Sequence, residues 1–146
     1  GDSAFTIGVG SISNDSQLLI NSTEKALEKG ILEVKSGVRV GDISCAIQGY
    51  SEGLGYSVVK QYVGHGIGRE LHEEPQIPNY GKKGLGPILS SGMVIAIEPM
   101  LTIGKSDTML LDDGWTVATA DGSLSAHFEE TVAITSSGSE ILTQVK

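Results

Sequence analysis

The hydrophobic residues of this chain recur at helical spacing through its first 55 positions. Ser13, a residue type common at helix N-caps, and Asp15 precede a pattern of helical period that continues to Gly37. Asp42 is expected to cap a second helix, which Gly55 ends. The residues that follow helical spacing are Leu18, Leu19, Ser22, Ala26, Leu27, Ile31 and Val34 in the first helix, and those that recur on one face of the second are Ile43, Ala46, Ile47, Tyr50 and Leu54.

From Tyr56 onward, β-branched and aromatic runs separated by Gly and Pro predict strands. The expected strands are Tyr56 to Val63, Met93 to Met100, Trp115 to Thr119 and His127 to Thr135. Residues 1–9 also have a strand-like pattern. The insert from Glu73 to Gly92 contains three prolines and few periodic positions, which predicts an ordered surface loop. Two helices among several strands indicate an α+β domain.

Composition limits the size and the class of the protein. The 146 residues, 39% of them hydrophobic, suffice for one domain with a core. A formal charge of -8, from 10 basic and 18 acidic residues, disfavours nucleic acid or an anionic membrane as a partner and suits cations. The one cysteine, Cys45, excludes an internal disulfide, which makes the cytoplasm the default location. Its apolar neighbours predict a small buried side chain.

The segment Gly64 to His72 reads Gly-His-Gly-Ile-Gly-Arg-Glu-Leu-His and presents two imidazoles from a stretch rich in glycine. Glycine permits positive φ, so the backbone beside His65 can approach a bound ion or substrate closely. On spacing alone, His65 is explained equally well as a metal ligand and as a loop histidine. His72 is either a surface residue or a second group that faces the same cavity.

Two carboxylates, Glu98 and Glu129, stand inside apolar strand-like runs, where an unpaired charge is costly. Asp2 stands at the start of the first strand-like segment. Carboxylates together with an imidazole are the ligands that Mn, Fe, Co or Zn accept. We therefore predict that these three carboxylates and His65 meet at a divalent cation.

Two other aromatic residues, Trp115 and His127, can be explained without a role in the site. Trp115 is either a core residue or, held by the turn Asp112-Asp113-Gly114, the wall of a cleft, and we favour the cleft. His127 is expected to have no role in the site. Strand alternation would bring it to the face of Glu129 only if no bulge lies between them.

Six motifs in order along essentially the whole chain resemble one known family. They are Gly1-Asp-Ser-Ala4, Tyr62 to Pro75, Pro78-Asn-Tyr80, Gly92 to Met100, Asp113-Gly-Trp-Thr116 and Leu124 to Glu129. The chain is similar in these motifs to the type I methionine aminopeptidases of the pita-bread metallopeptidase fold. The resemblance implies a curved antiparallel sheet with helices packed on its outer face. It also implies removal of the amino-terminal methionine from newly made proteins in the cytoplasm, with the ribosome as a further partner.

The resemblance also implies a ligand set for two divalent ions, Co, Mn, Fe or Zn. Asp2 and Glu129 would bridge the ions, and His65 and Glu98 would complete the coordination of one of them. Glu98 would also carry the proton of the attacking water. His72 would form a hydrogen bond near the scissile amide.

The remaining implied contacts concern the substrate pocket and a third ion. Leu71 and Trp115, together with His72, would contact the methionine substrate. Ser125 would belong to a monovalent-cation site.

One expected ligand has no counterpart in this sequence. The family's other chelating aspartate would lie on a strand before Gly1, so we expect residues 1–146 to be the carboxy-terminal part of a single catalytic domain. Such a chain would be completed by an amino-terminal segment of the same enzyme and inactive without it. Two alternatives stay open: an X-Pro aminopeptidase or dipeptidase of the same fold, and a non-catalytic pita-bread binding module.

Overall fold

The protein, a computed structural model that describes residues 1–144, contains two helices, α1 (Asn14–Leu32) and α2 (Val40–Gly53). Ser13 caps α1 as predicted, because its hydroxyl accepts a hydrogen bond from the Ser16 backbone N–H at 3.1 Å. The helix ends at Leu32, earlier than predicted. The N–H groups that follow bond to carbonyls three residues back, which tightens the last turn. Neither helix of residues 1–144 combines the length and the apolar character that a membrane crossing requires.

The N-cap of α2 is Arg39, so the prediction of Asp42 as the cap is wrong. Asp42 lies inside the first turn, and its carboxylate accepts hydrogen bonds from the backbone N–H groups of Arg39, at 2.8 Å, and of Gly84, at 2.9 Å. The helix is therefore capped from within, by a carboxylate that reaches back to its start. Gly55, with a φ of 87°, follows the helix as predicted.

Short antiparallel strands form three sheets in residues 1–144. The sheet with the order β1-β5-β8 contains Ser57–Val58, Met100–Thr102 and Ser125–His127. The sheet with the order β10-β9-β4-β2-β3 contains Ser139–Ile141, Glu130–Ile134, Val94–Ile97, Gly64–Ile67 and Glu73–Ile77. The hairpin β6-β7 contains Thr108–Leu110 and Val117–Thr119.

Two predicted strands are each divided in two. The run to Met100 is interrupted between β4 and β5, where Pro99 has no N–H to contribute to a ladder. The run from His127 is interrupted between β8 and β9, and there the Glu129 backbone N–H donates to the Ala4 carbonyl at 2.8 Å. This isolated bridge is the only strand pairing within residues 1–9, so the strand predicted there is otherwise absent.

The predicted surface loop from Glu73 to Gly92 begins with a strand, which corrects that prediction. Residues 73–77 form β3, the edge strand beside β2. Ile77 and Leu89 are fully buried and attach the insert to the core. Prolines are compatible with an edge strand, which leaves one row of backbone groups unpaired, so Pro75 does not prevent this pairing.

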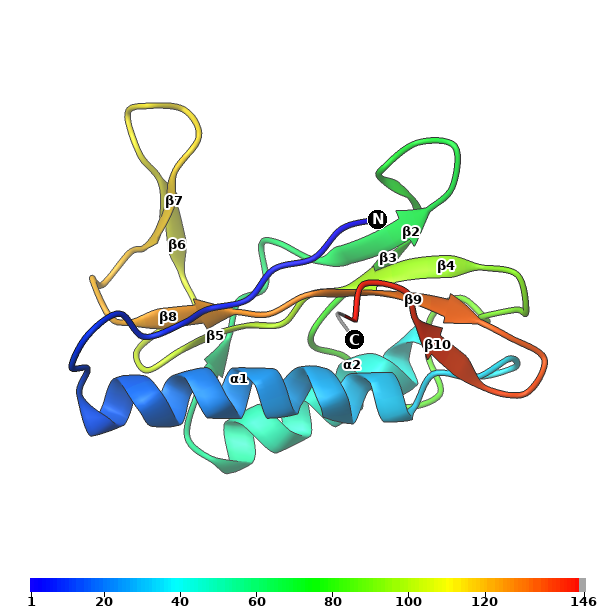
Figure 1. The fold of residues 1–146 in the computed structure, drawn as a ribbon, viewed down its shortest axis with the longest axis horizontal. Coiled ribbons are helices and arrows are strands. Elements are labelled where there is room, and N and C mark those ends of the chain that lie inside the picture. Colours follow the sequence, from blue (N-terminus) through cyan, green and yellow to red (C-terminus); the bar gives the residue numbers. More distant parts are fainter. Residues whose placement is uncertain (145–146) are drawn as a thin grey trace.

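The main hydrophobic core lies between the two helices and one face of the sheets (Figure 1). Ile43 and Ile47, from the predicted face of α2, are fully buried and belong to the same cluster as Ile95 of β4. Leu54 is exposed and Cys45 only partly buried, so those two predictions are wrong. The buried stripe of α2 instead includes small residues that allow close packing, at Gly41, Ser44 and Ser51.

The glycines of β2 allow neighbouring strands to approach closely. A Cβ atom at Gly64 would lie 2.3 Å from the Ala96 carbonyl oxygen, and one at Gly66 would lie 2.3 Å from the Glu74 carbonyl oxygen. Neither glycine has a positive φ, and both belong to a strand. The positive φ considered for this segment is therefore not used at Gly64 or Gly66, and these glycines instead remove side chains that would push the strands apart.

We expect Gly66→Ala to lower the free energy of unfolding by about 1–3 kcal/mol, because the new methyl group would meet backbone of β3 that cannot move aside. Gly49→Ala is the matched control. Gly49 lies in α2 with nothing within 4 Å of an added Cβ, so alanine there should stabilise the protein by about 0.5–1 kcal/mol. Urea denaturation of both variants measures the difference, and equal effects would contradict the packing role of Gly66.

Candidate metal centre

Strand register places three ligand-type side chains on one face of the sheet. His65 on β2 pairs with Ala96 on β4, which pairs with Thr131 on β9. Side chains alternate along a strand, so Glu98, two residues after Ala96, projects from the face of His65. Glu129, two residues before Thr131, does the same. The opposite face of these strands carries apolar residues of the core, so the site and the core share the same strands.

The four predicted ligands lie around one space. The Nε2 atom of His65 is 3.8 Å from Asp2 Oδ2 and 3.7 Å from Glu98 Oε1. Single ligand atoms of His65, Glu98 and Glu129 all lie within 4.8 Å of one another, as do those of Asp2, His65 and His72. Donor atoms about 2.0–2.2 Å from a first-row ion are at most about 4.4 Å apart, so small side-chain movements bring either set into range.

The hydrogen bond of His65 fixes which ring nitrogen faces this space. Its Nδ1 lies 3.0 Å from the Gly66 carbonyl oxygen, and because a carbonyl only accepts, Nδ1–H is the donor. In the neutral ring, Nε2 then carries the lone pair and points toward the carboxylates of Asp2 and Glu98. A lone pair directed at two carboxylates requires a positive charge between them. This arrangement is typical of a metal-binding histidine.

Glu129 is a buried carboxylate without a compensating partner. It is 6% exposed, and its Oε1 has no hydrogen-bond partner among the residues that the structure describes. Burial, followed by the charges of Glu98 and Asp2, raises the pKa of Glu129 from 4.5 to about 7. The donor set and this orphaned oxygen fit a divalent cation, whose charge would remove the cause of the shift.

The backbone of Asp2 is held in place by one buried hydroxyl. Thr131 Oγ1 accepts a hydrogen bond from the Asp2 N–H at 2.8 Å and donates one to the Asp2 carbonyl at 2.7 Å. Thr131 is 1% exposed and lies on the site face of β9. No pattern in the sequence indicates this contact, because the two residues are 129 positions apart.

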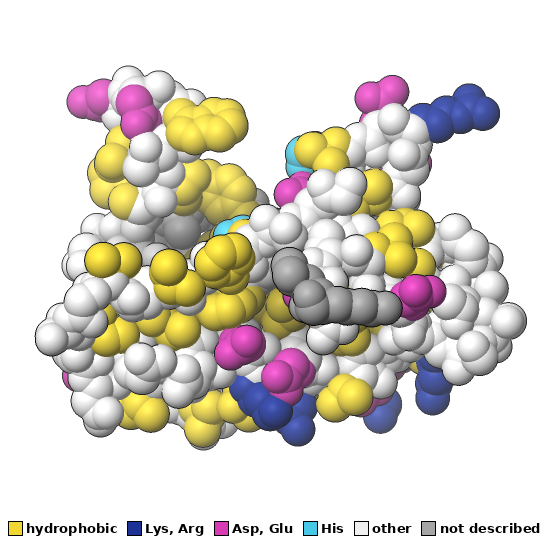
Figure 2. All heavy atoms as spheres, in the orientation of Figure 1, with side chains coloured by type: hydrophobic (Ala, Val, Ile, Leu, Met, Phe, Trp, Pro, Cys, Tyr) yellow, Lys and Arg dark blue, Asp and Glu magenta, His cyan; other side chains and the backbone are white. Residues whose placement is uncertain are grey.

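The other residues predicted for the site are His72, Leu71, Trp115 and Ser125, and the structure places only His72 in contact with a candidate ligand. His72 stands beside His65, with ring centroids 4.1 Å apart, although it is exposed as a surface residue would be. Leu71 is 48% exposed and Trp115 is 87% exposed, so Trp115 is not the core residue of the alternative reading. Ser125 lies on β8 and lines the same cavity as Glu98. Figure 2 shows a hollow between the β6-β7 hairpin and the turn from β2 to β3, with histidine side chains at its border.

A cavity of about 360 Å³ adjoins the ligand cluster. Glu98 and His127 form its wall on the side of the ligands. The remainder is largely apolar and is lined by residues of β5 to β8 and their neighbours, among them Val59, Tyr62, Met100, Val117 and Ala126. Leu71 and Trp115 lie outside this lining.

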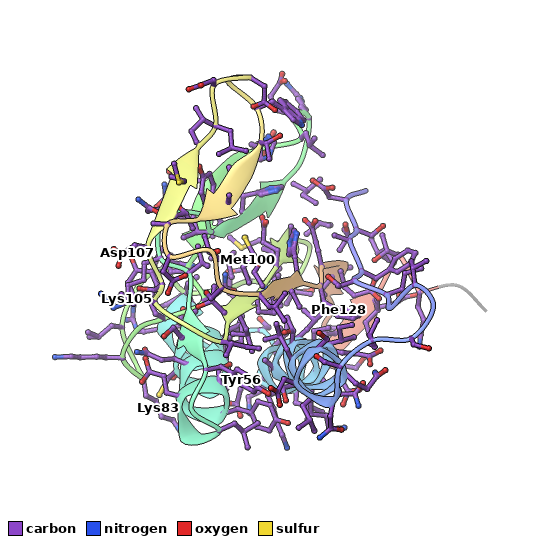
Figure 3. All side chains as sticks on the ribbon, turned by 90° about the vertical axis from the view of Figure 1, so that its left-hand side faces the viewer. Tyr56, Lys83, Met100, Lys105, Asp107 and Phe128 are labelled. Carbon is purple, nitrogen blue, oxygen red and sulfur yellow. The ribbon has the colours of Figure 1, made fainter. Side chains whose placement is uncertain are left out.

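Sequence reasoning gave no role to His127 and did not single out Met100. His127 pairs with Met100 across β8 and β5, and no bulge separates His127 from the face of Glu129. Figure 3 shows Met100 on the hairpin side of the sheet and Phe128 on the side of α1. The spacing of two residues between Met100 and Glu98, and between His127 and Glu129, was the available signal.

Residues 1–136 match metallopeptidase family M24, and the chain belongs to this family. It is 54% identical over 145 residues to the methionine aminopeptidase of Clostridium perfringens, an alignment that covers 99% of this chain and 58% of that protein. Methionine aminopeptidase 1 of Bacillus subtilis gives the same identity and coverage. The chain therefore spans less than two thirds of the length of these relatives.

Solved structures support the fold class. The methionine aminopeptidase of Thermotoga maritima superposes with a TM-score of 0.97 at 50% identity, covering 99% of this chain and 58% of that one. An Xaa-Pro dipeptidase from Bacillus anthracis superposes with a TM-score of 0.75 at 23% identity, over 100% of this chain and 36% of that one, and shares the fold. The predicted α+β pita-bread fold is confirmed, and membership of a metallopeptidase family implies a divalent metal.

The raised pKa of Glu129 makes the stability of the metal-free protein depend on pH. A carboxyl with a folded pKa of about 7 and an unfolded pKa of 4.5 contributes stability that is complete below pH 4.5 and is lost as the pH rises through about 7. The free energy of unfolding, measured with urea and a chelator, should fall by up to about 3 kcal/mol between about pH 5 and 8. Glu129→Gln should flatten this dependence, whereas Glu140→Gln, an exposed control, should preserve it. Identical profiles for all three proteins would contradict the assignment.

Proposed function

We propose that this chain carries the metal centre and part of the substrate cavity of an enzyme that removes the amino-terminal methionine from proteins. The observation that carries the proposal is the convergence of Asp2, His65, Glu98 and Glu129 around one space. Identity of 54% to proteins named methionine aminopeptidase supports this substrate class.

In this proposal, two divalent ions would be held by Asp2, His65, Glu98 and Glu129. Divalent ions bound there supply a water of lowered pKa and a positive charge beside the substrate carbonyl oxygen. The lone pair of His65 Nε2 is oriented by the Nδ1–H bond to Gly66. The orphaned Oε1 of Glu129 is free to bind, because no described residue competes for it.

Glu98 accepts the proton of the attacking water and passes it to the leaving amine. It stands at the boundary between the ligand cluster and the cavity, with 14% of its side chain exposed, so it can reach both the water and the substrate. His72, beside His65, donates a hydrogen bond toward the scissile amide or its oxyanion. The exposure of His72 leaves its ring accessible to a peptide in the hollow.

The cavity next to Glu98 is the proposed place for the methionine side chain. Its apolar lining suits a thioether, and its volume of about 360 Å³ exceeds that of one side chain. Leu71, between β2 and β3, and Trp115, between β6 and β7, are proposed as further contacts for the peptide. A cytoplasmic location suits this substrate and the single unpaired cysteine.

The closest functional alternative is cleavage next to proline by an enzyme of the same fold. The Xaa-Pro dipeptidase from Bacillus anthracis is 23% identical to this chain, against 54% for the methionine aminopeptidases, so the alternative is not favoured. Retention of the clustered ligands likewise disfavours a non-catalytic module.

The proposal is tested by peptide hydrolysis and by calorimetric titration with Mn²⁺. With the expected amino-terminal segment added, we expect release of methionine from a Met-Ala peptide and no release of alanine from an Ala-Pro peptide. Glu129→Ala should weaken Mn²⁺ binding and lower methionine release by at least about a hundredfold, because it removes a ligand rather than a supporting residue. Glu140→Ala, the exposed control, should change neither.

Three results would decide against parts of the proposal. Mn²⁺ binding that Glu129→Ala leaves intact would remove the metal site, and preference for the Ala-Pro peptide would favour the alternative enzyme. Full turnover by the 146-residue chain without an added amino-terminal segment would refute the expected dependence on that segment.

A further inference from the structure

His127 has an enclosed ring nitrogen that no hydrogen bond satisfies. Its Nε2 has no hydrogen-bond partner among the residues that the structure describes, although 36% of the side chain as a whole is exposed. Buried polar atoms without partners are rare and costly, so such an atom indicates an interaction that forms in the working protein. Sequence reasoning and the proposed ligand set both leave this histidine without a role.

The nearest charged group to this nitrogen is the carboxylate of Glu98. His127 Nε2 lies 3.5 Å from Glu98 Oε2, whereas the other oxygen, Oε1, lies 3.7 Å from His65 Nε2. An ionised carboxylate only accepts hydrogen bonds, so between Oε2 and His127 the imidazole must be the donor. Hydrogen bonds of this kind are often long before the substrate complex forms and shorten within it.

The backbone of His127 is fixed on two sides, which limits where its ring can go. On one side it pairs with Met100 of β5. On the other, the Thr6 hydroxyl accepts a hydrogen bond from the His127 N–H at 3.0 Å and donates one to the His127 carbonyl at 2.9 Å. The ring is therefore presented to Glu98 by a rigid support rather than by a mobile loop.

We propose that His127 is a positioning residue that donates a hydrogen bond from Nε2 to Glu98 Oε2, thereby holding the Glu98 carboxylate with Oε1 directed at the metal centre. The proposal rests on the proposed function of Glu98 as a ligand and proton carrier. It adds that the imidazole of His127 holds Oε2, which leaves Oε1 directed toward the ion that His65 Nε2 would also bind. A carboxylate fixed in this way loses less freedom on binding an ion.

The test compares substitutions that keep or remove the donor at the position of Nε2. The side-chain amide of His127→Gln can place an N–H near the original Nε2, whereas His127→Leu has no donor and His127→Asn is one carbon too short. The 146-residue protein is titrated with Mn²⁺ by calorimetry, and kcat and KM are measured with a Met-Ala peptide after the expected amino-terminal segment has been added. Circular dichroism establishes that each variant is folded, and His127→Asn replaces His127→Leu if the latter does not fold.

We expect the leucine and asparagine variants to bind Mn²⁺ about ten- to a hundredfold more weakly and to lose kcat by a similar factor. His127→Gln should restore both to within a few-fold of the unchanged protein. Mn²⁺ affinity that is equal in all proteins, with only KM altered, would assign His127 to the substrate cavity and overturn the proposal. A loss of Mn²⁺ affinity and kcat in His127→Gln as large as that in His127→Leu would also overturn the proposal. If the unchanged protein binds no Mn²⁺, the proposed metal site itself fails. If the unchanged protein binds Mn²⁺ and the variants bind it equally well, only the role of His127 fails.

Discussion

Electrostatic repulsion and desolvation among a few carboxylates constrain the whole arrangement around the site. Asp2, Glu98 and Glu129 face one space, and Glu129 is buried there without a hydrogen-bond partner for one oxygen. Left alone, this cluster would be relieved by protonation, as the raised pKa of Glu129 indicates. Divalent cations held among these carboxylates would compensate their charges, in keeping with membership of a metallopeptidase family.

The two faces of the central strands carry different kinds of side chain, apolar residues on one face and the candidate ligands on the other. Apolar residues such as Ile95 and Val132 face the helices, and their burial anchors the strands that carry the ligands on the other side. The strands are interrupted at Pro99, next to the candidate ligand Glu98, and at Glu129, which is itself a candidate ligand. Residues 1–9 have little strand pairing. Hydrogen bonds of the Thr6 and Thr131 hydroxyls to backbone groups hold this segment against the sheet instead. The positions of Asp2 and of His127 therefore depend on the same segment.

Much of the site was predictable because the relevant signals are local. A carboxylate inside an apolar run is costly wherever the run folds, so Glu98 and Glu129 stood out. The two helices followed from their period, and the start of α1 also from its cap at Ser13. The role of Gly64 and Gly66 was misjudged, because a glycine-rich sequence does not distinguish a positive φ from close strand packing. His127 was passed over for a related reason. Its neighbour in space, Glu98, lies between β4 and β5, and only the pairing of β5 with β8 brings the two residues together.

The sequence by itself determined the two helices, the α+β class and the chemical character of the ligands, since each of these depends on residue type and short-range spacing. Tertiary structure decided the edge strand β3, the division of the long strands and the orientation of each ligand atom. The contact between Asp2 and Thr131 spans 129 positions, and no periodicity encodes such a distance. Register is set by the simultaneous packing of strands on both sides of β4, so it becomes defined only when the chain has folded.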